Sequence, residues 1–266
     1  MQSNFVLCLA IVFLTILVDP VLSDGTQILS SSINRGALRS IEENDPENSN
    51  NYMIVYFNQK TSYDSGFQNE KRSGILEIKI GDSSVKPNDS FTIEKGAKIE
   101  IHFSSHVQSL ESFFDRLIDP NVINIESIDL SHFYSLEVIS TRFMFYECLN
   151  LESIDLSNFS PNSLTNMESM FEGCEGLISI NISKIPTSKV INTNRMFYGC
   201  QSLILIDMSN LNLENVQRAE LMFYDLPSLE YLSLNEGNYS SPIKEQLIAD
   251  LSNKDKLIIC SEKKNK

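Results

Sequence analysis

Cysteine residues recur at a fixed interval in the second half of the sequence. Cys148, Cys174 and Cys200 lie 26 residues apart, and Cys260 follows near the end. Thiols could form disulfides or bind a metal ion. A fifth cysteine, Cys8, lies in an apolar N-terminal run that is typical of a signal peptide, and the even number that would remain in the exported chain favours disulfides. The chemistry open to these residues therefore depends on where their side chains point.

The position that holds these cysteines holds a plain hydrophobic residue, Leu117 or Leu226, in two other copies of the same pattern. A metal site needs several converging ligands, whereas this pattern supplies one cysteine per copy and no converging histidine. We therefore predict small buried side chains, with no metal site, and we expect Cys260 to point inward from a strand.

A second column of polar residues could bind a cation. Asp129, Asp155 and Asp207 share one outward strand position with Asn181 and Ser233. Stacked carboxylates repel one another, and a bound Ca²⁺ ion is one remedy. Water and salt screening is the other, and we favour it because Asn181 interrupts the acidic column. Serines two residues later are expected to satisfy backbone groups at the turn.

The three histidines give no sign of a catalytic site. His102, His106 and His132 lie near the start of the repeats without a partner pattern for a triad or a metal centre. The sequence also has no phosphate-binding or dinucleotide-binding glycine pattern. We therefore predict a protein that is not an enzyme and has no cofactor.

The elements that position these columns are copies of one 26-residue unit. Met-Phe pairs recur at 144–145, 170–171, 196–197 and 222–223, and such a period is typical of stacked repeats. Triples that alternate as strands do recur at 128–130, 154–156, 180–182, 206–208 and 232–234. The apolar spacing of residues 164–174 matches one face of a helix. Each unit is therefore predicted to be a strand, a turn, a helix and a turn, stacked into a parallel sheet.

Less regular segments flank these copies. Residues 99–117 fit a first, degenerate repeat, with a five-residue excess within Asp119–Asn124 before the regular register begins. Residues 236–266 fit a degenerate closing repeat and a polar tail. Ser241 and Pro242 predict the start of a helix that runs to Leu251, and 257–260 predicts a last strand.

The repeats resemble a known family. Met170-Phe-Glu-Gly-Cys174, Leu177-Ile-Ser-Ile-Asn-Ile-Ser183 and the 26-residue step are similar to the BspA-like leucine-rich repeat surface proteins. The resemblance covers residues 99–235 well and 236–260 weakly, with departures at 185–186 and 225–227. It implies an α/β, leucine-rich-repeat-type solenoid, with export or surface display and adhesion or host-factor binding.

The N-terminal part lacks the repeat. The apolar run 5–18 is too short for an ordinary membrane span and precedes small residues, so 1–23 is predicted to be a cleaved signal peptide, with an uncleaved anchor as the alternative. Residues 24–50 have the composition of a flexible linker, and 51–98 that of a small β-rich cap. No second apolar span follows, so we expect a secreted or cell-surface protein with no membrane span after cleavage.

Net charge narrows the class of partner. The formal net charge of −14 argues against nucleic acid. We predict a protein or glycan partner on the strand-lined face, with Leu205 and Tyr231 as the best anchors. The candidate contact residues are Asp129, Asp155, Ser179, Asn181, Leu205, Asp207, Tyr231 and Ser233. A self-assembling surface coat is the alternative, and an enzyme in 24–95 is a third hypothesis without residues to support it.

Four sequons could carry glycans in a secreted eukaryotic chain: Asn88, Asn158, Asn181 and Asn238. A glycan on Asn181 would crowd the strand-lined face and push a binding site elsewhere.

Overall fold

The computed structural model describes residues 51–64, 74–104, 106–116, 119–134, 136–235, 239–251 and 258–262. In this part of the chain strands predominate, in sheets of six, four and two strands, and one α-helix is present. The predicted signal peptide (1–23) and linker (24–50) lie outside the described residues.

The first described strands are antiparallel. The six-stranded sheet begins in the order β4 (Ser83–Val85), β3 (Ile75–Ile80), β6 (Lys98–Phe103) and β1 (Tyr52–Phe57), and β2 (Thr61–Tyr63) pairs separately with β5 (Phe91–Ile93). Alternate residues of β6, Ile99, Ile101 and Phe103, are buried, which is the period expected of a strand with one covered face. Residues 99–103 were predicted to be the strand of a first parallel repeat. That prediction is wrong, because β6 pairs antiparallel with both β1 and β3.

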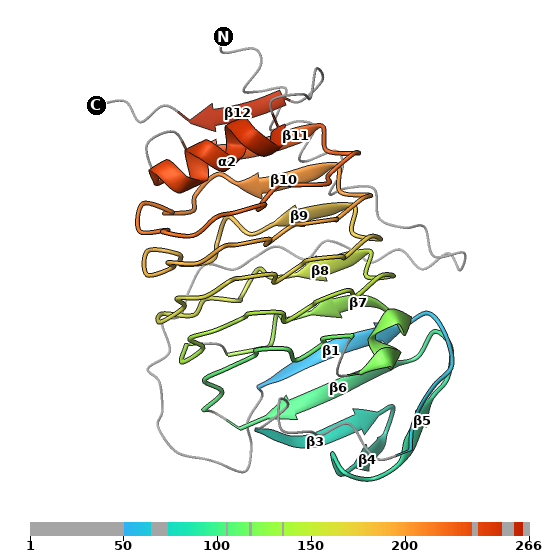
Figure 1. The fold of residues 1–266 in the computed structure, drawn as a ribbon. Helices are drawn as coiled ribbons and strands as arrows, with labels where there is room; N and C mark the ends of the chain where they lie inside the picture. Colours follow the sequence, from blue (N-terminus) through green and yellow to red (C-terminus); the bar gives the residue numbers. More distant parts are fainter. Residues whose placement is uncertain are drawn as a thin grey trace, which may run out of the picture. The chain divides into compact units, whose positions relative to one another are not determined.

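The repeats stack as coils of 26 residues from β7 (Ile125–Asp129) towards the C-terminal end (Figure 1). β1 pairs antiparallel with β7, and β7 pairs parallel with β8 (Ser153–Asp155), so the six-stranded sheet is mixed. The four-stranded sheet is parallel and holds β9 (Ser179–Asn181), β10 (Leu205–Met208), β11 (Tyr231–Asn235) and β12 (Ile258–Glu262). Isolated parallel bridges link neighbouring coils away from the strands, for example Asn166 to Asn192.

The predicted five-residue excess forms a short 3-10 helix, Pro120–Asn124, which Asp119 caps by accepting a hydrogen bond from the Asn121 N–H at 3.0 Å. This insertion explains why Ser109 bridges to Ser140, 31 residues on, whereas the later bridges join residues 26 apart.

Each coil has a turn segment where a helix was predicted, and we number the coils by these segments. Coils 1 to 5 have turn segments at 110–116, 141–148, 167–174, 193–200 and 219–226. In coil 2 the N–H groups of Phe143, Phe145 and Glu147 donate to carbonyls of coil 3 at 2.8–3.0 Å. The alternate N–H groups, such as those of Met144 and Tyr146, donate to carbonyls three residues earlier. Half of these donors are thus satisfied within the coil and half by the next coil.

The predicted α/β fold with a helix in every repeat is therefore wrong. The described residues form a mostly β structure with mixed, antiparallel and parallel sheets and a single α-helix. Two left-handed residues in each of coils 2 to 5, such as Ser169 (φ 53°) and Gly173 (φ 73°), break any α-helix at the expected place. The apolar residues of 164–174 do share one inward face, as predicted, but consecutive turns rather than a helix produce that face.

Stacked phenylalanines fill the core beneath the turn segments. The rings of Phe114, Phe145, Phe171, Phe197 and Phe223 lie 5.3–6.3 Å apart between centroids, with interplanar angles of 3–20°. Offset stacking of this kind is a favoured arrangement of aromatic rings. All five side chains are at most 1% exposed, so the ladder forms a continuous core through the coils.

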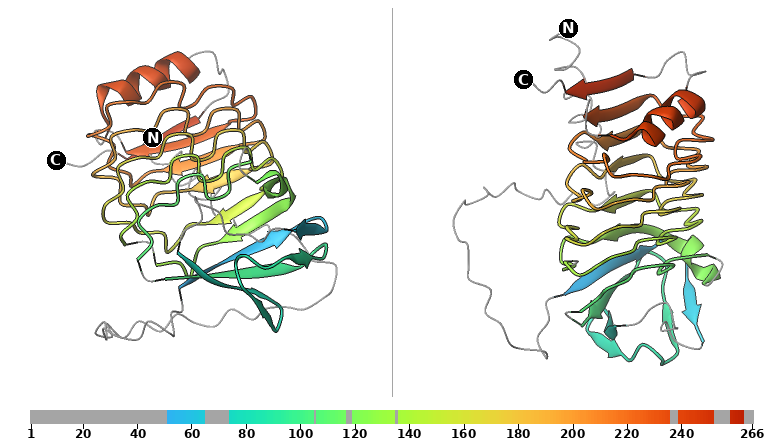
Figure 2. Two further views of the ribbon diagram at one scale, coloured as in Figure 1. Left: turned by 60° about the horizontal axis from the view of Figure 1, so that its bottom comes forward. Right: turned by 60° about the vertical axis from the view of Figure 1, so that its left-hand side comes forward.

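The α-helix takes the place of a turn segment after the last coil. α2 (Ser241–Leu251) lies over the end of the stack (Figure 2), and its start agrees with the predicted Ser-Pro signal. Gln246 Oε1 accepts from the Leu221 N–H at 2.8 Å, and Asp250 Oδ2 accepts from the Phe223 N–H at 3.1 Å. These side chains thereby supply the acceptors that a following coil would offer.

Candidate functional site

A pocket of about 360 Å³ opens on the turn-segment side of coils 1 to 4, and we call it the coil-3 pocket. This volume lies near the lower end of the range typical of small-ligand sites, about 300–1,000 Å³. Coil 3 supplies Glu168, Ser169 and Glu172, which lie at its centre. The complete lining is Asp115, Phe143, Tyr146, Glu168, Ser169, Glu172 and Arg195.

Differences between neighbouring coils create this pocket. Ser169 occupies the position that Phe143 has in coil 2 and Arg195 in coil 4. Glu172 occupies the position that Tyr146 has in coil 2. Two large side chains are therefore replaced by a small one and a carboxylate in one coil, which leaves a hollow between coils that retain the large ones.

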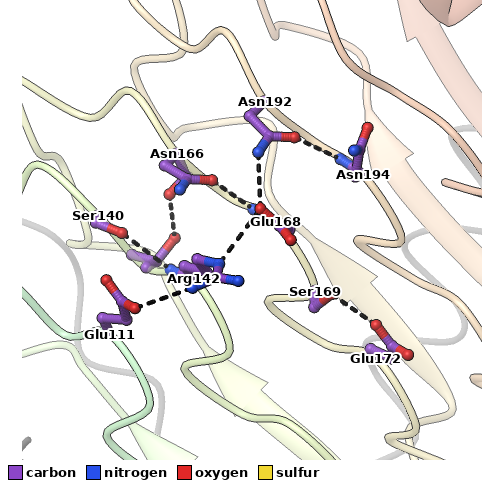
Figure 3. A network of polar contacts seen from close by, with 10 residues as sticks. Glu111, Ser140, Arg142, Asn166, Glu168, Ser169, Glu172, Asn192 and Asn194 are labelled. Carbon is purple, nitrogen blue, oxygen red and sulfur yellow. Dashed lines mark hydrogen bonds and ion pairs between the residues drawn. The ribbon is translucent and has the colours of Figure 1, made fainter.

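Hydrogen bonds and ion pairs hold Glu168 and Glu172 in place, and Figure 3 shows the contacts of Glu168 and the bond between Ser169 and Glu172. Glu172 accepts from Ser169 Oγ at 2.6 Å and pairs with Arg195 Nη1 at 3.0 Å. Glu168 Oε2 accepts from Asn192 Nδ2 at 2.8 Å and pairs with Arg142 Nε at 3.3 Å. Both carboxylates have fixed positions, and since each has about four acceptor sites, each retains capacity for a further donor.

Arg142 and Arg195 also lie over aromatic rings. The Arg142 guanidinium carbon is 4.3 Å from the centroid of Phe143, and that of Arg195 is 4.8 Å from the centroid of Tyr198. Arg142 thus contacts two carboxylates and one ring, and Arg195 one carboxylate and one ring, a combination that favours cations through charge and through the ring quadrupole.

The side chains around the pocket have a small excess of negative charge. Three carboxylates line it, on Asp115, Glu168 and Glu172, against Arg195 in the lining and Arg142, which pairs with Glu168 from outside it. The pKa of Tyr146 is raised to about 12, and burial is the main cause. The charge of Glu147 and the hydrogen bond between Tyr146 and Glu147 add to this effect, as do the charges of Glu172 and Asp115. Burial disfavours a charge of either sign, whereas the neighbouring carboxylates disfavour a negative charge alone.

Two stacked tyrosines, Tyr198 half-buried and Tyr224 exposed, extend the surface beyond the pocket. Tyr198 and Tyr224 stack with their centroids 5.6 Å apart, and Tyr224 is 49% exposed. Arg195 joins the two regions, because it lines the pocket and lies over Tyr198. We call Tyr198, Tyr224 and the coil-3 pocket together the turn face.

The strand-lined face that the sequence predicted as the binding surface has a local structural role. Asp129, Asp155, Asn181 and Asp207 each accept a hydrogen bond through Oδ1 from the backbone N–H two residues on, at 2.7–3.0 Å. The acidic column thus stabilises the turns after the strands, a role that we had assigned to the serines. No cation is needed to explain its spacing.

Leu205 was predicted to be an exposed anchor, and that is wrong. It is 5% exposed and lies between Ser179 and Tyr231 in register, which shield it within the sheet. Of the eight predicted contact residues only Asp155 and Asn181 are exposed; the five besides Leu205 that are half-buried are Asp129, Ser179, Asp207, Tyr231 and Ser233.

Three of the four sequons lie in the described residues. Asn88 is exposed in a turn, Asn158 is exposed in the turn after β8, and Asn181 is exposed at the end of β9. Asn158 Nδ2 donates to the Ser131 carbonyl of the preceding coil, so a glycan there would start from an amide engaged in stacking. Asn238 lies outside the described residues, and glycosylation at all four stays a prediction.

The repeated cysteines are core thiols with a specific contact. Cys148, Cys174 and Cys200 are 0% exposed, and none forms a disulfide. Their Sγ atoms donate to phenylalanine carbonyls of the preceding coil at 3.0–3.2 Å, which the sequence analysis did not foresee. Burial is the main cause that raises the pKa of the Cys174 and Cys200 thiols, so both stay protonated. Leu117 lies outside the described residues. Cys260 was predicted at an inward strand position, whereas β12 pairs it in register with Ser233 of the outward column.

The described residues have neither a metal-binding cluster nor a membrane-spanning helix. They contain no group of three or more His, Cys, Asp or Glu side chains placed to hold a metal ion. They also include no helix with the length and apolar character needed to cross a membrane.

Part of the chain is similar to a known protein family. Residues 104–234 match the model of a family described as a Mycoplasma protein of unknown function, DUF285. No curated protein and no solved structure matches the chain. The matched stretch contains the turn segments of coils 1 to 5 and every residue of the turn face, so this surface lies wholly within the part of the chain that is similar to that family.

Proposed function

We propose that this protein is an exported or cell-surface scaffold that binds a protein partner through its turn face and catalyses no reaction. The observation that carries the proposal is the coil-3 pocket beside Tyr198 and Tyr224, where a repeat that is otherwise regular departs from its pattern. Export and adhesion are what the resemblance to BspA-like surface proteins implies, and the apolar run 5–18 supports export.

The turn face has the composition of a contact surface. Tyrosine and arginine contribute most to the energy of many interfaces, and Tyr198, Tyr224 and Arg195 lie together here. The strand-lined face is a weaker choice, because its acidic column is engaged with backbone N–H groups and Leu205 is buried.

A self-assembling coat has less support. End-to-end growth needs free backbone donors on the last coil, whereas Gln246 and Asp250 already accept from Leu221 and Phe223. Sedimentation over a range of concentrations tests this point, and a growing oligomer would favour the coat.

The test compares two matched variants that each add one positive charge to an exposed position. Tyr224→Arg alters the turn face and Ser153→Arg alters the strand-lined face. Purified protein is used to capture partners from candidate cell surfaces, and the captured proteins are identified by mass spectrometry. A partner lost with Tyr224→Arg and retained with Ser153→Arg supports the proposal. Loss with Ser153→Arg alone would overturn the assignment of the face, and no specific capture by the unaltered protein would overturn the scaffold.

A further inference from the structure

The coil-3 pocket also indicates what kind of group it binds. Its walls combine carboxylates with aromatic rings, and its volume admits one extended side chain rather than a folded domain. Three carboxylates line it against Arg195, and Arg142 pairs with Glu168 from outside the lining, so these five groups sum to one negative charge, which favours a cationic group over an anionic one.

Two arginines on the same surface each contact an aromatic ring and at least one carboxylate of the protein itself. Arg142 lies over Phe143 and pairs with Glu111 and Glu168, each at 3.3 Å. Arg195 lies over Tyr198 and pairs with Glu172. These internal contacts show the geometry that this backbone offers to a guanidinium group: one ring from the turn segment and one carboxylate from a neighbouring coil.

Tyr146 and Asp115 repeat that combination within the pocket. Both line it, they come from adjacent coils, and Asp115 is 6% exposed. Glu172, from the coil on the other side of Tyr146, is 7% exposed and adds a second carboxylate. A cation between these groups would be shielded from water, where a charge pair is stronger than at an open surface.

A metal ion is a poorer occupant than an organic cation. No three acidic, histidine or cysteine side chains in the described part of the chain converge as metal ligands do, so the carboxylates surround a volume rather than a point. A guanidinium or ammonium group at the end of a flexible chain suits such a volume, because its donors spread towards several acceptors and its stem packs on aromatic carbon.

We propose that the coil-3 pocket receives an arginine or lysine side chain from a basic segment of a protein partner. This inference rests on the proposed function and names the chemistry of the partner. Tyr198 and Tyr224 favour a protein segment over a free amine, because they offer contact area beside the pocket on which the flanking residues of such a segment can lie.

The probe is a capped Gly-Gly-Arg-Gly-Gly peptide, with a second peptide in which citrulline replaces arginine. Citrulline keeps the shape and removes the charge. Free agmatine, which has the same guanidinium without a peptide backbone, is a third probe. Affinity is measured by calorimetry on the full chain at low and high salt.

Two variants act on the pocket and one serves as a control. Ser169→Phe fills the pocket with the residue that coil 2 has at the same position, where the backbone has nearly the same φ (56° at Phe143 and 53° at Ser169). Glu172→Gln keeps the size and removes one charge. Glu152→Gln removes one charge from an exposed position at the strand-lined side. Circular dichroism and thermal unfolding confirm that each variant is folded.

We expect the arginine peptide to bind, and the citrulline peptide to bind at least about tenfold more weakly because a charge-assisted contact is lost. Ser169→Phe and Glu172→Gln should weaken binding to a similar degree, Glu152→Gln should leave it unchanged, and salt should weaken it. Equal binding of both peptides, no binding of the arginine peptide, or full binding by Ser169→Phe would overturn the proposal. Agmatine binding as tight as the peptide would overturn the assignment to a protein segment.

Failure here is distinguishable from failure of the proposed function. If Tyr224→Arg abolishes partner capture while the peptides fail to bind the pocket, the scaffold stands and the cationic ligand falls. If partner capture survives Tyr224→Arg but not Ser153→Arg, the turn face itself falls, whatever the peptides do.

Discussion

Replacement of Asp250 tests whether a side chain of α2 substitutes for the backbone of a missing coil. Asp250 Oδ2 accepts from the Phe223 N–H at 3.1 Å, and Phe223 is 0% exposed. Asp250→Leu would leave that N–H without an acceptor in a buried place. An unsatisfied buried donor costs about 1–3 kcal/mol, so we expect the free energy of unfolding to fall by that amount at pH 7.

Asp250→Asn separates the hydrogen bond from the charge. The amide oxygen can still accept from Phe223, so we expect a loss below about 1 kcal/mol. Burial raises the pKa of Asp250, and the hydrogen bond from Phe223 opposes that effect only in part. The folded protein therefore holds a proton on Asp250 more tightly than the unfolded chain does.

The sign of the pH dependence follows from linkage. The contribution of a carboxyl whose folded-state pKa is raised is fully present below its ordinary range and is lost as the pH rises through the folded-state pKa. Relative to Asp250→Asn, the unaltered protein should thus be more stable at acidic pH than at pH 7. Since both proteins share every other titrating group, their difference isolates this residue.

Urea denaturation at several pH values, followed by circular dichroism, measures these differences. Glu245→Leu is the control, because Glu245 is exposed on the same helix. If Asp250→Leu lost no more stability than Glu245→Leu, the Phe223 N–H would not depend on Asp250. If Asp250→Asn lost as much as Asp250→Leu, the charge would matter and the acceptor would not.

Other substitutions test the core, the turns and the thiols. Phe171→Ala should lower the free energy of unfolding in urea by about 3–5 kcal/mol, because it opens a cavity in the stacked ladder. Asp155→Ala should lower it by about 1 kcal/mol, because its turn is exposed. Equal losses would contradict the assignment of Phe171 as inward and Asp155 as outward. Gly199→Ala should cost about 1 kcal/mol in the same assay through its backbone conformation (φ 71°) alone. Gly176→Ala should cost more, because its new Cβ would lie 2.8 Å from a backbone carbonyl oxygen, and the reverse order would refute this account. Cys174 should resist thiol reagents until the protein unfolds, because it is buried and burial raises the pKa of its thiol. Peptide mapping by mass spectrometry measures the labelling rate, and labelling faster than unfolding would show that the core is open.

The strands were the most predictable part of the fold. The alternation at 128–130, 154–156 and 206–208 placed isoleucine inward and aspartate outward, and the register pairs these residues across coils as expected. Helix α2 was also predictable, because Ser241 and Pro242 are a start signal and no left-handed residue follows within it. In both cases a local preference agrees with the tertiary structure.

The turn segments were not predictable from apolar spacing. Inward residues at intervals of three, three, one and three are common to a helix and to consecutive turns, so the period cannot separate the two. Gly173 and Gly199 are the available signal, since glycine at a fixed position suggests a left-handed residue. Glu147 and Asp225 conceal that signal in coils 2 and 5, where they adopt φ values of 53° and 57°.

The coil-3 pocket was missed because it arises from residues that are small or acidic where neighbouring coils have large ones. A search for chemical groups at regular spacing selects columns that persist, such as the cysteines and the aspartates. Ser169 and Glu172 interrupt their columns, and comparing each column across coils would have found them. The aspartates, which do persist, hold the turns instead.

The one-way hydrogen bonds of the turn segments also have an electrical consequence. The N–H groups of Phe143, Phe145 and Glu147 and their counterparts in coils 1, 3 and 4 all donate towards the C-terminal end. Peptide dipoles aligned in this way add, as they do along a helix, and produce partial positive charge where the donors end. Asp250 lies at that end. Insertion of a further 26-residue coil would lengthen the column of peptide dipoles. Asp250 would still lie at the positive end of that column.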